Sequence, residues 1–283
     1  MAADALTSRE YWRLHWEHVR LPVIKQPSAD MAGLLATFLP KGGHTTFLEV
    51  GCAPGAWMAY FHREFGYQVS GIEYVEEAAA TTRKNLEMQG IEARVITADL
   101  FEYEPGGGGY DVVYSGGLIE HFEDQQAVVS KVCSLSTDMV VTQVPHLLGL
   151  NGLIRKVARP GIFRTHVPVS CDALRRHHEA GGLTTLFCDG VDGIQLTPPA
   201  GEGRRLFEKH PALARLINLP VRALNKASRW ASARTGVFPR WRFASNHLLY
   251  IGRRAPTAPD AGAGSADGRR ECKESRTGPE TPL

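Results

Sequence analysis

The sequence lacks the cysteine pattern of a disulfide framework or of a structural zinc site. Its five cysteines are odd in number and widely spaced, and no two of them form a Cys-x-x-Cys pair. It also lacks an uncharged apolar run that approaches the roughly 20 residues a membrane helix needs, and its N-terminal segment has no signal-like apolar stretch. We therefore expect reduced thiols, a cytoplasmic location and no integral membrane segment.

An excess of charge of one sign is also absent. The 283 residues include 32 basic and 30 acidic side chains, which are interspersed, whereas a nucleic-acid-binding protein presents a basic face. We expect a small-molecule ligand and no nucleic acid. No Asp, Glu and His residues stand at tight metal-ligand spacing, and adjacent His177 and His178 would point to different sides of a helix. The sequence therefore predicts no metal site.

What the sequence does contain is a regular alternation of short apolar runs and longer helical patterns, which is typical of a parallel sheet with crossover helices. The predicted strands are Thr46 to Val50, Gln68 to Glu73, Ala93 to Ala98, Tyr110 to Tyr114, Met139 to Val144, Leu183 to Cys188 and Asn246 to Ile251. The predicted helices between them include Val75 to Gln89, Asp124 to Leu135 and Cys171 to Ala180, the last capped by Ser170. The expected fold class is α/β, with a mostly parallel seven-stranded sheet, helices on both faces and an antiparallel last strand.

Two stretches do not fit this alternation and are predicted insertions, 145–169 and 197–242. The second contains the helical patterns Arg204 to His210 and Ala212 to Ala233, and Pro220 should kink or split the latter. The expected domains are a core of 41–196 and 243–254, a helical cap of 197–242 between the last two strands, and a disordered tail of 255–283.

A glycine-rich turn, Glu49-Val50-Gly51-Cys52-Ala53-Pro54-Gly55, leaves the first predicted strand and enters a predicted helix. Glycine lets a ligand approach the backbone without a Cβ in the way. The second strand ends in Glu73, whose carboxylate can accept hydrogen bonds from the two hydroxyls of a ribose. The turn and the acid together predict a nucleoside ligand.

In these residues the chain resembles the class I S-adenosylmethionine (SAM)-dependent methyltransferases, which have a Rossmann-like fold. The family motif is an acid followed by Gly-x-Gly-x-Gly, and the chain departs from it only at Ala53. The resemblance implies that Glu49 and the turn face the methionine end of SAM, that Glu73 holds the ribose, and that Asp99 lies beside the adenine. It also implies S-adenosylhomocysteine as product. The cofactor-binding residues expected from it are Tyr11, Glu49, Gly51, Ala53, Gly55, Glu73, Tyr74, Asp99, Leu100 and Ser115.

A nicotinamide-dependent dehydrogenase is the nearest alternative, because it shares the turn and the second-strand acid. The glycine spacing lacks the G-x-G-x-x-G frame, Asp99 adds an acid after the third strand, and the last strand is expected to be antiparallel. These three features favour the methyltransferase.

Histidines near strand ends are the candidates for a general base, which a hydroxyl acceptor needs and a neutral amine does not. His121 follows the fourth strand and His146 follows the fifth, so both are predicted catalytic residues at the ligand edge of the sheet. His166 ranks third. The Glu-His pair also recurs in the family where no base is needed, so His121 is alternatively a loop-ordering or cofactor-contacting residue.

The N-terminal segment 1–40 resembles the lid helices that such enzymes fold over SAM. Tyr11 is the first candidate for a lid contact and Trp16 the second, while Trp12 and Trp16 could equally form the buried face of a helix.

The two insertions supply further apolar and aromatic residues, among them Phe163, Trp230, Phe238, Trp241 and Phe243, which could wall a pocket for a planar or apolar acceptor. The expected activity is N- or O-methylation of a small secondary metabolite, as in natural-product or antibiotic biosynthesis. The alternatives are a lipid, quinone or sugar acceptor, or a SAM-binding module without catalysis. The basic second insertion would also suit a membrane surface or a homodimer contact.

Overall fold

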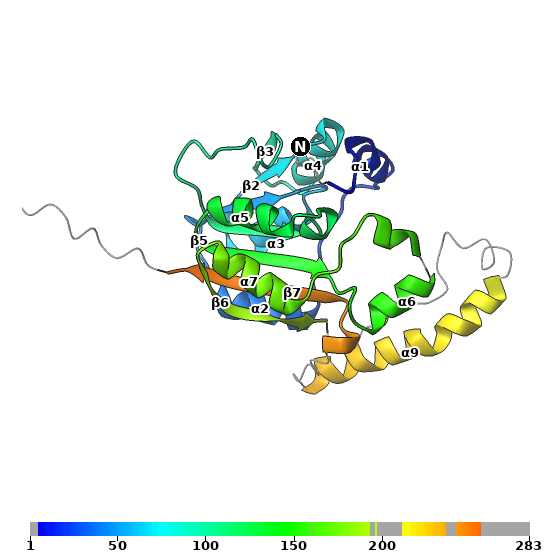
Figure 1. The fold of residues 1–283 in the computed structure, drawn as a ribbon. Helices are drawn as coiled ribbons and strands as arrows, with labels where there is room; N and C mark the ends of the chain where they lie inside the picture. Colours follow the sequence, from blue (N-terminus) through cyan, green and yellow to red (C-terminus); the bar gives the residue numbers. More distant parts are fainter. Residues whose placement is uncertain (1–4, 159, 193–195, 197–210, 236–241, 256–283) are drawn as a thin grey trace, which may run out of the picture.

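The computed structural model describes residues 5–158, 160–192, 196, 211–235 and 242–255. Its centre is one seven-stranded sheet in the order β3-β2-β1-β4-β5-β7-β6 (Figure 1). The strands are β1 (Thr46–Val50), β2 (Gln68–Glu73), β3 (Arg94–Thr97), β4 (Tyr110–Gly116), β5 (Ser136–Pro145), β6 (Leu183–Val191) and β7 (His247–Arg254). β1 to β5 pair in parallel, whereas β7 is antiparallel to both β5 and β6. The predicted fold class is confirmed.

The helices mostly lie where their apolar spacing and capping residues predict them. They are α1 (Arg9–Trp16), α2 (Ala29–Phe38), α3 (Ala56–Phe65), α4 (Glu76–Glu87), α5 (Gln125–Ser134), α6 (Leu150–Ala158), α7 (Cys171–Ala180) and α9 (Pro211–Thr235), with short 3₁₀ turns η1 (Ile119–His121), η2 (Pro160–Arg164) and η3 (Arg242–Ala244). The Asp124 carboxylate and the Ser170 hydroxyl cap α5 and α7 by accepting hydrogen bonds from backbone N–H groups three residues on.

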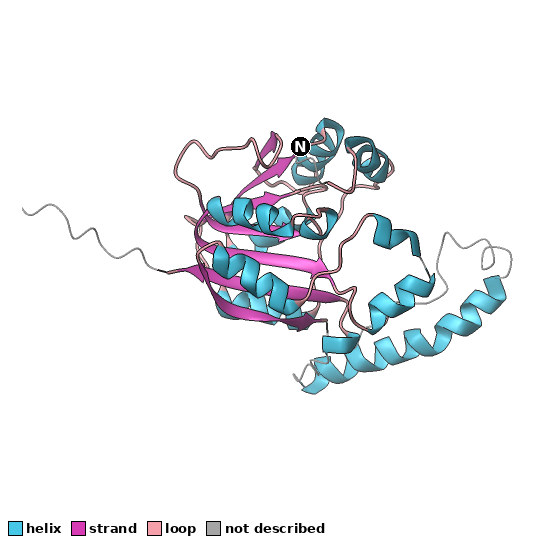
Figure 2. Ribbon diagram, in the orientation of Figure 1, coloured by secondary structure: helices cyan, strands magenta, loops and turns pink. Residues whose placement is uncertain are grey.

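Helices cover both faces of the sheet, as Figure 2 shows. On one face α2, α3 and α4 pack through side chains such as Leu35, Phe61 and Leu86. On the other face α5 and α7 pack through Val132 and Leu174. Because strand side chains alternate between faces, the central strands contribute to both cores. The residues of the site lie at the carboxyl ends of β1, β2 and β4.

Two sequence expectations differ from the structure. Within 1–40, α1 lies beside the site, whereas α2 packs into the core through Met31, Leu34 and Leu35 and is no lid. Pro220 does not split α9, which runs unbroken from Pro211 to Thr235 with Pro220 exposed to solvent. The predicted helix over 204–210, Phe238, Trp241 and the predicted disordered tail lie outside the described residues, apart from position 255.

Candidate active site

The glycine-rich turn forms the floor of the site at the end of β1. Gly51 and Gly55 have φ of 71° and 81°, a region that glycine enters without strain. A Cβ on Gly55 would lie 2.9 Å from Cγ2 of Thr82 in α4, so close helix packing also requires glycine there. The Gly51 and Cys52 N–H groups both donate to the Ile72 carbonyl, at 2.9 and 3.1 Å, which fixes the turn against β2.

Two buried carboxyl groups flank this turn. Glu49 is 4 % exposed, and its Oε2 accepts a hydrogen bond of 3.1 Å from the Met58 N–H. Glu73 is 6 % exposed, and its Oε1 accepts one of 3.1 Å from the Val75 N–H. Burial raises the pKa of both carboxyls, that of Glu49 well above its usual value. Both carboxyls therefore gain from a ligand that brings positive charge or hydroxyl donors.

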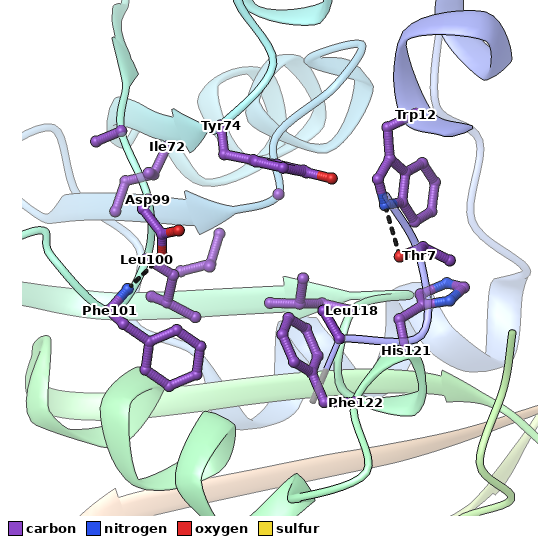
Figure 3. Close-up of a pocket in the computed structure, with 14 residues that line it drawn as sticks. Thr7, Trp12, Ile72, Tyr74, Asp99, Leu100, Phe101, Leu118, His121 and Phe122 are labelled. Atoms are coloured by element: carbon purple, nitrogen blue, oxygen red, sulfur yellow. Dashed lines mark hydrogen bonds between the residues drawn. The ribbon is translucent and has the colours of Figure 1, made fainter. Parts of the chain in front are cut away.

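A narrow apolar cleft lies between the ends of β2, β3 and β4, and we call it the adenine-side cleft (Figure 3). Its walls include Ile72, Leu100 and Leu118, with Asp99 at one end and Tyr74 across it. The Asp99 carboxylate accepts a hydrogen bond of 3.0 Å from the Phe101 N–H, which orders the loop after β3. An apolar cleft with one acidic end suits a heteroaromatic base.

A cavity of about 720 Å³ adjoins this cleft and shares Gly51, Tyr74, Leu118 and His121 with it. We call it the main cavity. Its cofactor side contains Glu49, Ala53 and Glu73, and its opposite side contains Glu120, His121 and His166. Its volume is within the range of roughly 300–1,000 Å³ that is usual for ligand sites.

The α1 helix closes one side of the main cavity. Tyr11, Trp12, His15 and Trp16 all line it, and none of the α1 side chains is buried. Trp12 donates a hydrogen bond of 3.0 Å from Nε1 to Thr7 Oγ1 and packs edge-on against the His121 ring at 4.9 Å. Both Trp12 and Trp16 thus line the cavity. The alternative from the sequence, that they form a helix face buried in the core, does not hold.

His121 faces the main cavity from η1 and is 4 % exposed. Its Nδ1 lies 2.6 Å from the Thr165 carbonyl, so Nδ1 carries the hydrogen and Nε2 presents a lone pair. Burial lowers the pKa of His121 to about 4. The ring is therefore neutral at physiological pH but weakly basic, which weakens it as a general base for a hydroxyl.

Two predicted site residues lie outside the described cavities. Ser115 is fully buried in β4, one residue before Gly116, which does line the main cavity. His146 turns toward the segment 242–246, and its N–H donates to the Asn246 carbonyl at 2.8 Å. A Cβ on Gly149 would meet the His146 ring at 2.7 Å, so that ring is packed against its own loop. His146 therefore packs against its own loop and does not line the main cavity, where the sequence predicted a catalytic residue.

Several site residues were missed by the sequence prediction. Trp57 at the start of α3 lines the main cavity, and Lys25 Nζ lies 4.2 Å from the centre of its ring. Glu120 and His166 were not assigned a joint role, yet they meet His121 in one cluster that could hold a metal ion, where the sequence predicted no metal site. His166 is far from His121 along the chain, so local spacing carries no signal of this contact.

The second insertion does not supply the expected aromatic wall. Trp230 and Phe243 are 60 % and 49 % exposed, and no described residue of α9 lines the cavities above. The aromatic residues of the site come instead from α1 and α3 and from the segments after β2, β3 and η1.

The chain matches a protein family over the part that contains the glycine turn and the acids at the ends of β1 and β2. Residues 47–137, from β1 into the start of β5, match a family model described as a methyltransferase domain. No curated protein matches the chain.

Solved structures resemble the chain in fold. A putative sarcosine dimethylglycine methyltransferase from Galdieria sulphuraria has a TM-score of 0.55 at 12 % identity, with 87 % of this chain and 98 % of that one covered. A geranyl diphosphate C-methyltransferase from Streptomyces coelicolor has 0.52 at 17 %, covering 80 % and 78 %. The [4+2]-cyclase SpnF has 0.52 at 14 %, covering 79 % of each chain. At these identities the likeness concerns the fold.

The fold has the strand order of a Rossmann-like methyltransferase core, and the matched residues 47–137 form its first half. Residues 47–137 match a methyltransferase domain, and the site fits SAM as its cofactor: a glycine turn open to a ligand, two buried carboxyls beside it and an apolar cleft with Asp99 at one end. No helix among the described residues is long and apolar enough to cross a membrane.

Proposed function

We propose that the enzyme transfers the methyl group of SAM to a nitrogen or oxygen of a small acceptor, such as a secondary metabolite. The carrying observation is that one continuous cavity has carboxyl groups on its cofactor side and Glu120, His121 and His166 on its other side. Bound SAM supplies an activated methyl group, and the protein positions the acceptor in line with it and excludes water.

The cofactor-side residues have the following proposed roles. Glu49, with Gly51, Ala53 and Gly55, holds the charged methionine end, and the Glu73 carboxylate accepts hydrogen bonds from the ribose hydroxyls. Tyr74, Asp99 and Leu100 flank the base, and Tyr11 closes over the site from α1. Ser115 acts only through the position it gives Gly116. On the acceptor side, His121 lines the cavity beside the position of the acceptor.

The test is methyl transfer together with calorimetric titration of SAM and of NAD. Because one fold neighbour is named for a cyclisation, methyl transfer itself must be measured, by the mass gain of one methyl on an acceptor. We expect SAM to bind and NAD not to bind. Binding of NAD without SAM would refute the proposal, and SAM binding without transfer to any nitrogen or oxygen acceptor would favour a binding module.

A lipid or quinone acceptor at a membrane surface is the second candidate function, and the surface of α9 favours it. The helix contains five basic residues and no acidic one. Leu213, Leu216, Leu219 and Trp230 are 42 to 68 % exposed on it, and Leu153 and Val157 of α6 are 59 % and 72 % exposed. An apolar face with a cationic margin suits an anionic lipid surface.

Vesicle sedimentation separates the two candidates. If α9 docks on membranes, the wild-type chain sediments with vesicles that contain phosphatidylglycerol and not with pure phosphatidylcholine vesicles. The double substitution Leu216→Glu and Leu219→Glu should abolish sedimentation without unfolding, since both residues are exposed. The matched control is Met88→Glu, which adds charge at an exposed apolar residue after α4. Equal sedimentation of all three proteins would remove the membrane function.

A further inference from the structure

Three side chains of metal-ligating type meet at the acceptor side of the main cavity. Glu120 and His121 come from η1, and His166 comes from the loop after η2. One ligand atom from each lies within 4.8 Å of the other two, and His121 Nε2 is 4.0 Å from Glu120 Oε1. The two imidazole rings are 4.3 Å apart between centroids.

Backbone carbonyls orient both histidines for ligation. The Thr165 carbonyl accepts from His121 Nδ1 at 2.6 Å, and the Ile162 carbonyl accepts from His166 Nδ1 at 3.1 Å. A carbonyl can only accept, so each ring carries its hydrogen on Nδ1 and keeps a lone pair on Nε2. A carbonyl that holds the second nitrogen in this way is the usual outer partner of a metal-binding histidine.

Glu120 supplies the independent observation that points to a ligand. Its side chain is 3 % exposed, and its Oε2 is buried without a hydrogen-bond partner among the described residues. A buried carboxylate oxygen without a hydrogen-bond partner is destabilising, and its cluster neighbours are two imidazole rings whose Nδ1 atoms face backbone carbonyls. The cluster thus brings three electron-pair donors together in one place.

We propose that Glu120, His121 and His166 bind a divalent transition-metal ion at the acceptor side of the cavity. Two imidazole nitrogens and one carboxylate favour Zn²⁺, Mn²⁺, Fe²⁺ or Co²⁺ over Mg²⁺ and Ca²⁺, which prefer oxygen ligands. Two histidines and one glutamate are also a known catalytic zinc set, which leaves a coordination position for water or substrate. Ligand atoms in such a site are roughly 3.3 Å apart, so the side chains must approach by about 1 Å.

This ion would define the acceptor chemistry, an extension that rests on the proposed methyl transfer. An acceptor hydroxyl bound to the ion loses its proton more readily, and the proton passes to solvent. The oxygen then forms a bond to the methyl carbon as the carbon–sulfur bond breaks and its electron pair goes to sulfur. The products are a methyl ether and neutral S-adenosylhomocysteine. The site therefore favours O-methylation over transfer to an amine, which needs no such activation.

The test is direct metal binding by the full chain after chelation and dialysis. Calorimetric titration with Zn²⁺ should give one ion per chain, and Co²⁺ should give the visible absorption of a tetrahedral nitrogen and oxygen site. Glu120→Gln and His166→Gln should each weaken Zn²⁺ binding by at least about 10-fold, because each removes a ligand. The control His44→Gln changes an exposed histidine before β1 and should bind as the wild type does.

The outcomes separate this inference from the proposed function, because SAM titration is run on the same samples. SAM binding with no Zn²⁺ binding overturns the metal site and leaves the methyltransferase. Zn²⁺ binding that His44→Gln weakens as much as His166→Gln does would also overturn it. If Glu120→Gln does not fold, the half-buried His166 carries the test. Loss of methyl transfer on chelation and its recovery with Zn²⁺ or Mn²⁺ would support the role in O-methylation.

Discussion

Replacement of Gly71 by alanine tests how the glycine-rich turn is held in place. Gly71 lies in β2, where its backbone conformation is open to any residue. A Cβ there would lie 2.6 Å from both Cβ and Sγ of Cys52 in the turn, and 2.8 Å from Sδ of Met58 in α3. Both neighbours are fully buried, and the Met58 N–H is the donor to Glu49. One added methyl group therefore presses on the turn and on the helix that orients the cofactor-side acid.

Two effects of opposite sign decide the result. Chain entropy alone would make Gly71→Ala stabilising by about 0.5–1 kcal/mol. Overpacking of a tight core typically costs about 1–3 kcal/mol, and contacts of 2.6 Å to a Cβ fixed to the backbone belong at the upper end. We expect a net loss near 2 kcal/mol, which corresponds to a fall in Tm of about 4–8 °C in a protein of this size.

The assay is thermal unfolding with and without SAM, with calorimetry for the SAM affinity. Gly71→Ala should lower both the Tm and the SAM affinity, because the displaced turn no longer matches the ligand. The control is Gly33→Ala in α2, where a Cβ would meet nothing within 4 Å and should raise the Tm slightly. A Gly71→Ala protein as stable as the wild type would refute the packing argument.

Three further predictions follow from buried groups. Glu49→Gln should reduce SAM affinity by about 10- to 100-fold in calorimetry, the value of a hydrogen bond to a charged group, yet should not lower the Tm without SAM, because burial already raises the pKa of that carboxyl. His178 is fully buried, and burial lowers its pKa from 6.5 to about 4. The unfolded chain therefore takes up the proton first as pH falls, and urea unfolding should show the wild type losing about 3 kcal/mol more than His178→Gln between pH 6.5 and 4. His146→Gln should change kcat by less than about twofold in a methyl-transfer assay, since its ring lies away from the cavity. A large loss of kcat would show that His146 acts in the active site.

Most of the fold could be predicted from local patterns in the sequence. The strands alternate with helices whose caps are visible as single residues, such as Ser170 before α7, and the glycine turn with Glu49 and Glu73 is a short-range motif at strand ends. These features depend on neighbours along the chain, so the sequence could predict the sheet, its antiparallel last strand and the cofactor side of the site.

The acceptor side depends on contacts between distant segments, and there the sequence prediction was incomplete. His166 reaches His121 only because the backbone of the first insertion returns to η1, where the Val167 N–H donates to the Glu120 carbonyl at 2.7 Å. His146 also follows a strand end, but its ring turns the other way, toward η3. Strand-end position alone could not distinguish the two outcomes, since side-chain direction after a strand depends on the loop that follows.

The most direct test of the central claim is calorimetric titration of SAM into the wild-type chain and into Glu73→Ala. We predict one SAM per wild-type chain and a loss of about 10- to 100-fold in affinity in the variant, because Glu73 provides a charged acceptor for the ribose hydroxyls. Unfolding curves of both proteins without SAM provide the control for folding. Equal SAM affinity in the two folded proteins would contradict the placement of the ribose at the end of β2, and absence of SAM binding by the wild type would contradict the account as a whole.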